Sequence, residues 1–315
     1  MSTDIDRTVW QGRIDPEANS DRWHQRIEPL TETAIPGCAL IGFASDAGVA
    51  RNRGRIGAAE GPTAIRKALA PLAWHRQNPA YDAGNVRCDG DALETAQQAL
   101  AERLVPLLDA GHLPIVLGGG HEMAYASWCG LAAHLALARE ESCPLVGIIN
   151  LDAHFDLRDH AHVRSSGTPF SQIAEDCQTR GWPFRYACLG VSRGANTQVL
   201  YERAVTLNVM VREDRDMHTA ALPELQNDLK AFMAQCDYLY LTIDLDVLPA
   251  AEAPGVSAPA ARGVSLALLE PLIESVRDSG KLKLADLAEL NPKFDIDRRT
   301  AKVAASLVHL LTLNG

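Results

Sequence analysis

The sequence lacks the cysteine pattern of disulfide-bonded or zinc-thiolate proteins, and it lacks the long apolar run of membrane-spanning proteins. Its seven cysteines are scattered, without a CxxC pair, so neither a disulfide framework nor a thiolate zinc site is predicted. No apolar stretch reaches the roughly eighteen residues that a membrane span needs. The start, MSTDIDRTVW, is acidic where a signal peptide would be basic and then apolar. We therefore expect a cytoplasmic protein that does not act at a membrane.

Basic clusters are also missing. The formal net charge is -10 at pH 7, and no block of basic residues interrupts the chain, which argues against nucleic acid as a partner. Hydrophobic residues make up 47% and charged residues 22%, a mix that is ordinary for globular proteins. The composition therefore predicts a protein that folds compactly and does not bind nucleic acid.

Apolar runs that suit buried parallel strands alternate with stretches of helical length, in which apolar residues lie three and four positions apart. The strand candidates begin at Cys38, Leu113, Pro144, Tyr186, Tyr238 and Leu282, with weaker ones near Tyr81 and Val209. This alternation predicts a three-layer α/β/α fold with a mostly parallel central sheet of about eight strands. Residues 1–34 are predicted to be an irregular arm, and residues 35–315 a single catalytic domain.

Three of the strand candidates end in side chains that bind metal ions. NLDAHFD, at 150–156, and TIDLDV, at 242–247, carry such side chains at alternate positions and therefore on one face of an extended segment. LPIVL, at 113–117, is followed by three glycines and a histidine. Open α/β sheets place their sites at the carboxyl ends of the strands, so these side chains should converge. The set is His121, Asp152, His154, Asp156, Asp244 and Asp246.

Carboxylates dominate this set and no thiolate contributes, which favours Mn²⁺ over zinc or copper. Four aspartates supply enough oxygens for two ions, the arrangement that activates water for hydrolysis. Taken singly, an aspartate at a strand end is more often a helix cap and a lone histidine a structural residue. Burying all six together without a cation would be very costly, however, so the set as a whole predicts a binuclear metal site.

Four motifs together resemble those of the ureohydrolases, the family of arginase, agmatinase and formimidoylglutamase. GGGHE (118–122), NLDAHFD, TIDLDVLPAAEAPGVSAP and DLAELNP (286–292) occur in the family's order, and the similarity extends roughly from Ala39 to the C-terminal helix. The resemblance implies an arginase-like fold and two Mn²⁺ per subunit. It also implies attack of water on a planar, cationic carbon, with homo-oligomers being common.

The resemblance further implies a role for each residue. One ion would be held by His121, Asp152, Asp156 and Asp244, and the other by Asp152, His154, Asp244 and Asp246. Asp246 would accept and relay a proton, and Glu289 would hold the substrate cation. Glu289 could instead simply precede a helix start, and Asp286 lies at odd spacing from it.

Two departures from arginase suggest the substrate. In SSGTPF, Ser166 stands where arginases and agmatinases have a histidine, and this segment resembles that of formimidoylglutamases; His162 nearby could replace that histidine or simply lie at the surface. Arg158 stands where arginases have an asparagine, and a guanidinium suits a substrate carboxylate, although pairing with Asp159 is an alternative.

A second strand end, SRGANT at 192–197, resembles a pocket segment of formimidoylglutamases. Arg193 is therefore another candidate for a substrate carboxylate, and Asn196 another substrate-binding candidate. Arg51, Arg53 and Arg55 lie in a glycine-rich loop and could reach the substrate, although arginines in such loops more often point into solvent.

We therefore expect hydrolysis of N-formimidoyl-L-glutamate to L-glutamate and formamide. The alternative on the same scaffold is a guanidino-acid hydrolase that releases urea. A dinuclear phosphoesterase is less compatible, because such enzymes close their site with late histidines and this chain has only His309 there. A degenerate family member that only binds is a further alternative, but the full ligand set argues against it.

Overall fold

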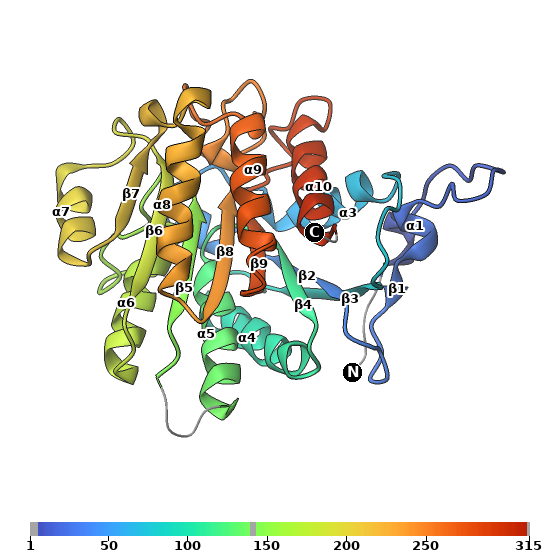
Figure 1. Cartoon of the computed structure of the whole chain (residues 1–315), viewed down its shortest axis with the longest axis horizontal. Helices are drawn as coiled ribbons and strands as arrows, with labels where there is room; N and C mark the ends of the chain where they lie inside the picture. Colours follow the sequence, from blue (N-terminus) through green and yellow to red (C-terminus); the bar gives the residue numbers. More distant parts are fainter. Residues whose placement is uncertain (1–5, 139–142, 314–315) are drawn as a thin grey trace.

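The computed structural model describes residues 6–138 and 143–313, and its centre is a nine-stranded sheet in which every pairing is parallel (Figure 1). The strand order is β1-β3-β2-β4-β9-β8-β5-β6-β7. The predicted α/β/α class and the parallel sheet are confirmed.

The strands are β1 Glu28–Pro29, β2 Cys38–Ala44, β3 Ala80–Arg87, β4 Leu113–Gly118, β5 Val146–Leu151, β6 Arg185–Val191, β7 Met210–Glu213, β8 Tyr238–Asp244 and β9 Leu282–Ala288. The α-helices are α1 Trp23–Arg26, α2 Ala47–Arg51, α3 Gly61–Leu69, α4 Leu93–Asp109, α5 Met123–Ala138, α6 Pro169–Arg180, α7 Gln198–Thr206, α8 Leu222–Ala234, α9 Leu266–Arg277 and α10 Arg299–Thr312. Short 3₁₀ turns lie at η1 Arg7–Val9, η2 Ala58–Glu60, η3 Asp214–Asp216, η4 Thr219–Ala221 and η5 Leu245–Val247.

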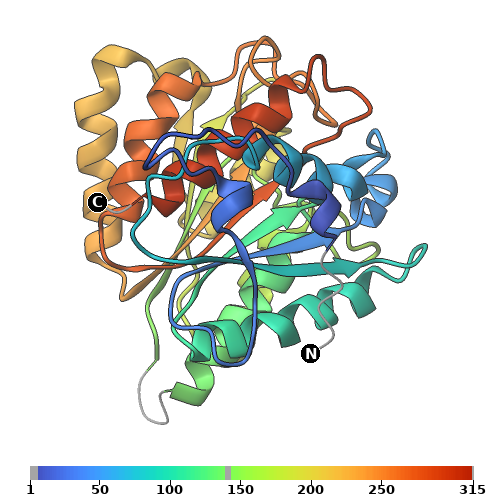
Figure 2. The same cartoon turned by 90° about the vertical axis from the view of Figure 1, so that its right-hand side faces the viewer.

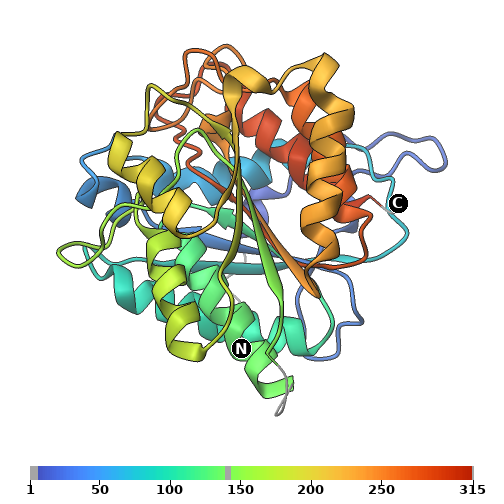
Figure 3. The ribbon, with the colours of Figure 1, turned by 60° about the vertical axis from the view of Figure 1, so that its left-hand side comes forward.

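Helices cover both faces of the sheet. Strand side chains alternate between two apolar clusters, so that Ile115 and Leu117 belong to one and Val116 to the other. The first cluster includes residues of α3, α8, α9 and α10, and the second includes residues of α4, α5, α6 and α7. Figure 3, which brings the β7 edge forward, shows α8 on one side of the strands and α6 on the other. Among the described helices, none combines the length and apolarity needed to cross a bilayer.

The ninth strand lies in the segment that the sequence predicts to be an irregular arm. β1 is only two residues long and pairs with β3, which makes the sheet one strand larger than expected. A two-residue strand has no apolar alternation, so its sequence gives no strand signal. The sheet therefore has nine strands where about eight are predicted, and residues 1–34 contain this short strand together with η1 and α1.

The N-terminal segment packs firmly on the sheet edge and on α10 (Figure 2). Trp23 is fully buried, and its indole Nε1 donates to Nδ1 of His309 at 3.1 Å. Trp10 donates to the carboxylate of Asp82 at 2.7 Å, which also binds Arg66 in a buried ion pair. The segment is thus anchored by apolar burial and by hydrogen bonds at two separate points.

Candidate metal centre

The candidate site lies at the carboxyl ends of four adjacent strands at the middle of the sheet. β4, β9, β8 and β5 are consecutive in the strand order, and each delivers a chemical group just beyond or at its last residue. These groups are His121 after β4, Glu289 after β9, Asp244 at the end of β8 and Asp152 after β5. Parallel pairing brings these ends to the same edge, so residues far apart in sequence become neighbours.

The first group of candidate ligands surrounds one ring nitrogen. Nδ1 of His121 lies 3.2 Å from Oδ2 of Asp152, 3.0 Å from Oδ2 of Asp156 and 3.2 Å from Oδ2 of Asp244. His121 is 1% exposed. Three carboxylates therefore converge on one imidazole inside the protein, as the sequence predicts.

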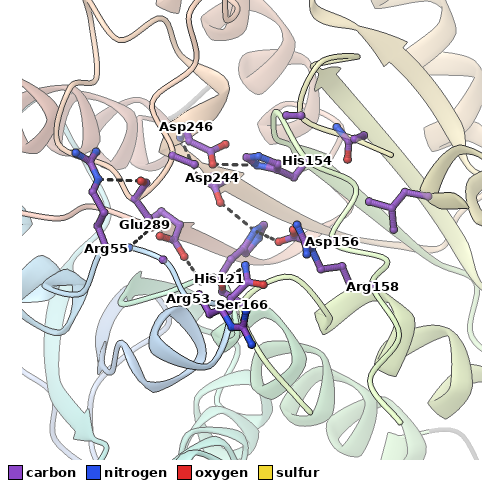
Figure 4. A pocket seen from close by; sticks show the side chains of 17 residues that line it. Arg53, Arg55, His121, His154, Asp156, Arg158, Ser166, Asp244, Asp246 and Glu289 are labelled. Carbon is purple, nitrogen blue, oxygen red and sulfur yellow. Dashed lines mark hydrogen bonds and ion pairs between the residues drawn. The ribbon is translucent and has the colours of Figure 1, made fainter. Parts of the chain in front are cut away.

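The second group shares one carboxylate with the first. Nδ1 of His154 lies 3.1 Å from Oδ2 of Asp246 and 3.5 Å from Oδ1 of Asp152. Asp152 thus takes part in both groups, whereas Asp244 falls only in the first. Figure 4 shows the side chains of His154, Asp244 and Asp246 close together.

Local backbone contacts fix the aspartates in place. Oδ1 of Asp152 accepts from the backbone N–H of His154 at 2.6 Å, and Oδ1 of Asp244 accepts from that of Asp246 at 2.8 Å. Each carboxylate therefore keeps its other oxygen for the centre of the group. Asn150 donates to that second oxygen of Asp152 at 2.9 Å, which restricts it further.

The glycines before His121 allow a close approach of two backbone segments. A Cβ at Gly119 would lie 2.3 Å from the carbonyl oxygen of Ser45 and 2.6 Å from that of Phe43. The backbone carbonyl of Gly119 also accepts from the N–H of Glu289 at 2.8 Å. A side chain at this position would push His121 away from the other strand ends.

The site is electrostatically strained without a cation. Burial, and then the charges of Asp246 and Asp152, raise the pKa of Asp244 well above its usual range. Burial and the neighbouring Asp152 raise the pKa of Asp156 to about 6. Burial opposes a charged His121, but the surrounding carboxylates outweigh it and raise the pKa of this imidazole. Clustered buried carboxylates of this kind favour a bound divalent ion.

An unsatisfied atom supports the same conclusion. Nδ1 of His121 is buried and makes no hydrogen bond of acceptable geometry, although three carboxylate oxygens lie 3.0–3.2 Å away. Oxygens and nitrogen that face a common point without bonding each other are arranged as ligands of a shared cation. A set of ligands made up of oxygen and nitrogen atoms, without sulfur, suits a hard or borderline ion such as Mn²⁺.

Glu289 lies beside the metal groups with one oxygen free. Its Oε1 accepts from the backbone N–H of His121 at 3.0 Å, and its Oε2 is buried without a partner. Burial and the neighbouring carboxyl of Glu122 raise the pKa of Glu289 to about 8. Its backbone has a positive φ of 70°, a conformation that a non-glycine residue adopts only where the surroundings impose it.

A cavity of about 310 Å³ opens above these groups. Its lining includes His121, His154, Asp156, Asp244, Asp246 and Glu289. Arg53, Arg55 and Arg158 lie around them (Figure 4). The cavity thus combines an acidic floor with a basic rim, which suits a ligand that carries both a cationic and an anionic group.

The arginines proposed to bind substrate differ in whether they line the cavity. Arg158 and Arg53 line the cavity, and among the described residues neither guanidinium has a hydrogen-bond or ion-pair partner. Arg193 does not line it: its guanidinium binds Glu213 at 2.6 Å and lies over the ring of Tyr201. The expectation that Arg193 contacts the substrate is therefore corrected, because a partner 20 residues away in the sequence holds it.

Two other arginines hold the rim in place. Arg51 forms ion pairs with Asp91 and Glu94, both at 2.7 Å. Arg55 donates to the carbonyls of Val256 and Ser257 and lies 4.1 Å from the ring centre of Phe294. Arg53, between them, has a positive φ of 59° and is left facing the cavity. The sequence leaves open whether these three arginines reach the substrate or point into solvent, because their partners cannot be identified from spacing.

The other predicted site residues, Ser166, Asn196 and His162, also differ in whether they line the cavity. Ser166 lines the cavity and accepts from Asn52 at 3.3 Å. Asn196 also lines it, but its amide donates to the carbonyls of Ala153 and Ser192 and accepts from the N–H of Phe155. Asn196 therefore supports the loop that carries His154, and its position in the cavity lining is compatible with the predicted contact with substrate. His162 is exposed and does not line the cavity.

Known proteins resemble the chain over nearly its whole length. A formimidoylglutamase from Aeromonas hydrophila is 58% identical over 311 residues, which cover 98% of this chain and 98% of that relative. A formimidoylglutamase from Ralstonia nicotianae is 57% identical over 313 residues, which cover 98% of this chain and 95% of the relative.

Solved structures show the same architecture. A Trypanosoma cruzi formiminoglutamase with two Mn²⁺ matches with a TM-score of 0.78 and 25% identity over 88% of this chain and 93% of that one. A formimidoylglutamase from Bacillus subtilis matches in fold with a TM-score of 0.82 at 20% identity, covering 96% and 94% of the two chains. Residues 36–313 match the Arginase family, and the chain belongs to that family.

Proposed function

We propose that the protein hydrolyses N-formimidoyl-L-glutamate to L-glutamate and formamide. The observation that carries this proposal is the 57–58% identity, over almost the full length, to proteins named formimidoylglutamase. The cavity supports it, because its acidic floor suits an amidinium and its two unpartnered arginines suit the carboxylates of the same substrate. The reaction adds one water across the formimidoyl carbon–nitrogen bond.

Two Mn²⁺ per subunit are the proposed cofactors. His121, Asp152, Asp156 and Asp244 would hold one ion; Asp152, His154, Asp244 and Asp246 would hold the other. When bound, such a pair of divalent ions acidifies water and so makes a nucleophile available at neutral pH. The shared position of Asp152 supports a bridging role for that residue, whereas the bridging role of Asp244 rests on the family resemblance.

Glu289 is proposed to orient the formimidoyl group. Its free Oε2 is buried at the cavity wall and can accept an N–H of the substrate amidinium. Because Oε1 is held by the N–H of His121, the carboxylate has a fixed direction relative to the metal groups. A cation bound here would also offset the repulsion between Glu289 and Glu122.

Asp246 is proposed to accept the proton that water loses and to return it to the leaving nitrogen. Asp246 lines the cavity, and its Oδ2 lies 3.1 Å from Nδ1 of His154. The 3₁₀ turn η5, whose cap is Asp244, fixes the position of its backbone. Protonation of the glutamate nitrogen allows glutamate to leave as the amine.

Arg158 and Arg53 are proposed to bind the two carboxylates of formimidoylglutamate. Both line the cavity, and both guanidinium groups remain available. Ser166, whose hydroxyl accepts from Asn52, also lines the cavity and offers a hydroxyl to the substrate. A neutral or cationic side chain in the substrate, as in agmatine, would leave these arginines unpaired, which would disfavour its binding.

A substrate panel tests the proposed function directly. The Mn²⁺-loaded protein should release formamide from formimidoylglutamate and much less urea from arginine, agmatine or guanidinobutyrate. Quantifying both products in parallel separates the amidine substrate from a guanidino-acid substrate. Urea from guanidinobutyrate without formamide from formimidoylglutamate would overturn the proposal.

We further propose that the enzyme works in the cytoplasm as a homo-oligomer. All seven cysteines are free, which suits a reducing compartment. Exposed apolar side chains such as Val205 (81%) and Leu137 (73%) are available for contacts between subunits. Cell fractionation and light scattering would test the two statements separately.

A further inference from the structure

Asp286 is the acidic residue of the DLAELNP motif that the metal groups do not explain. It lies on β9, is fully buried, and is not among the residues that line the cavity. Its register partner on the adjacent strand β8 is Thr242. Tyr240, two residues before Thr242, has its side chain on the same face of β8.

These three residues connect to a candidate metal ligand through buried polar contacts. The hydroxyl of Tyr240 donates to Oδ2 of Asp286 at 2.5 Å. Oγ1 of Thr242 lies 2.9 Å from Nε2 of His121. Tyr240, Thr242 and Asp286 are 0% exposed and His121 is 1% exposed, so water does not compete for these contacts.

The role proposed for His121 determines the direction of these hydrogen bonds. If Nδ1 of His121 faces a cation with its lone pair, Nε2 must carry the hydrogen and donate it to Thr242. The hydroxyl hydrogen of Thr242 then needs an acceptor of its own. Oδ1 of Asp286, its cross-strand neighbour, is buried and makes no hydrogen bond of acceptable geometry, which leaves it open to the nearby hydroxyls of Thr242 and Ser127. Asp286 would accept from Thr242 with one oxygen and from Tyr240 with the other.

We propose that Thr242, Asp286 and Tyr240 are positioning residues that fix the ring of His121 with Nδ1 toward the first metal group, and that they thereby set the affinity of this group for Mn²⁺. The inference rests on the metal role proposed for His121. His154 differs, since its side chain is 25% exposed and no described residue bonds its Nε2. Of the two imidazoles proposed to bind metal, only that of His121 thus has its Nε2 held by a described residue.

The test measures Mn²⁺ binding to the metal-free protein by competition with a fluorescent chelator. Thr242→Val keeps the shape but removes the hydroxyl, and should weaken the affinity of one Mn²⁺ by roughly 10–100-fold, the usual effect of losing a contact behind a ligand. Thr242→Ser, which keeps the hydroxyl, should restore most of it. Tyr240→Phe should weaken binding in the same direction by a smaller factor. At saturating Mn²⁺, the KM for substrate should not change.

A matched control separates this role from stability. Asp82→Asn alters another buried carboxylate, which pairs with Arg66 far from the metal groups, and should lower the unfolding temperature without changing Mn²⁺ affinity. Wild-type Mn²⁺ affinity in both folded Thr242→Val and folded Tyr240→Phe would overturn the inference. If Thr242→Val does not fold, Tyr240→Phe decides. Since only the metal is measured, a failure to hydrolyse formimidoylglutamate would refute the proposed function and not this inference.

Discussion

Arginine side chains near the cavity differ in what they already bind, and this difference predicts their effect on substrate affinity. Arg158→Ala and Arg53→Ala should each raise the KM for formimidoylglutamate by roughly 10–100-fold, because each removes a charge-assisted hydrogen bond worth about 1.5–3 kcal/mol. Steady-state kinetics would measure the change. Arg193→Ala is the control, since Glu213 holds that guanidinium outside the cavity. A KM that rises only in Arg193→Ala would contradict the assignment.

Asp152 is the residue on which both metal groups depend. Asp152→Asn removes a charge shared by the two groups, so the purified variant should retain less than one Mn²⁺ per chain and lose nearly all activity. Elemental analysis and turnover measure these two effects. Asp159→Asn, at an exposed position of the same loop, should change neither quantity. Full metal content in Asp152→Asn would show that the carboxylates do not act as proposed.

At the level of elements, the turn after β4 sets the position of His121. Gly119→Ala would place a methyl group against the backbone carbonyls of Ser45 and Phe43, which cannot move aside without displacing β2. We expect a loss of about 1–3 kcal/mol in unfolding free energy together with weaker metal binding. Chemical denaturation measures the first effect. Gly194→Ala has open space around its Cβ and should change stability by less than about 0.5 kcal/mol.

The strands and the site also show which features the sequence predicts and which it does not. The apolar runs predicted β2, β4, β5, β6, β8 and β9 because buried parallel strands are continuously hydrophobic. The six candidate ligands were found because they follow those strands at alternate positions. β1 was missed because two residues carry no periodic pattern. The partners of Arg193 and Asn196 were missed because the contacts that occupy these side chains depend on tertiary structure.

For the whole molecule, the strand order explains why residues more than a hundred positions apart form one site. β4, β9, β8 and β5 come from four separate stretches of the chain, yet they lie side by side at the sheet centre. Without a cation, their ends hold several buried carboxylates at short range. Repulsion between these carboxylates therefore destabilises the whole sheet, because the strands that carry them contribute side chains to both apolar clusters.

This arrangement predicts that metal binding stabilises the entire fold. An ion that binds only the native state at roughly 100 times its Kd adds about 2.7 kcal/mol to the unfolding free energy. Removing Mn²⁺ with a chelator should therefore lower the unfolding temperature by several degrees, and adding Mn²⁺ back should restore it, as measured by differential scanning calorimetry. In Asp152→Asn the same addition should have little effect, because the shared ligand is missing. An equal shift in both proteins would mean that Mn²⁺ stabilises the fold from somewhere other than the carboxyl ends of these strands.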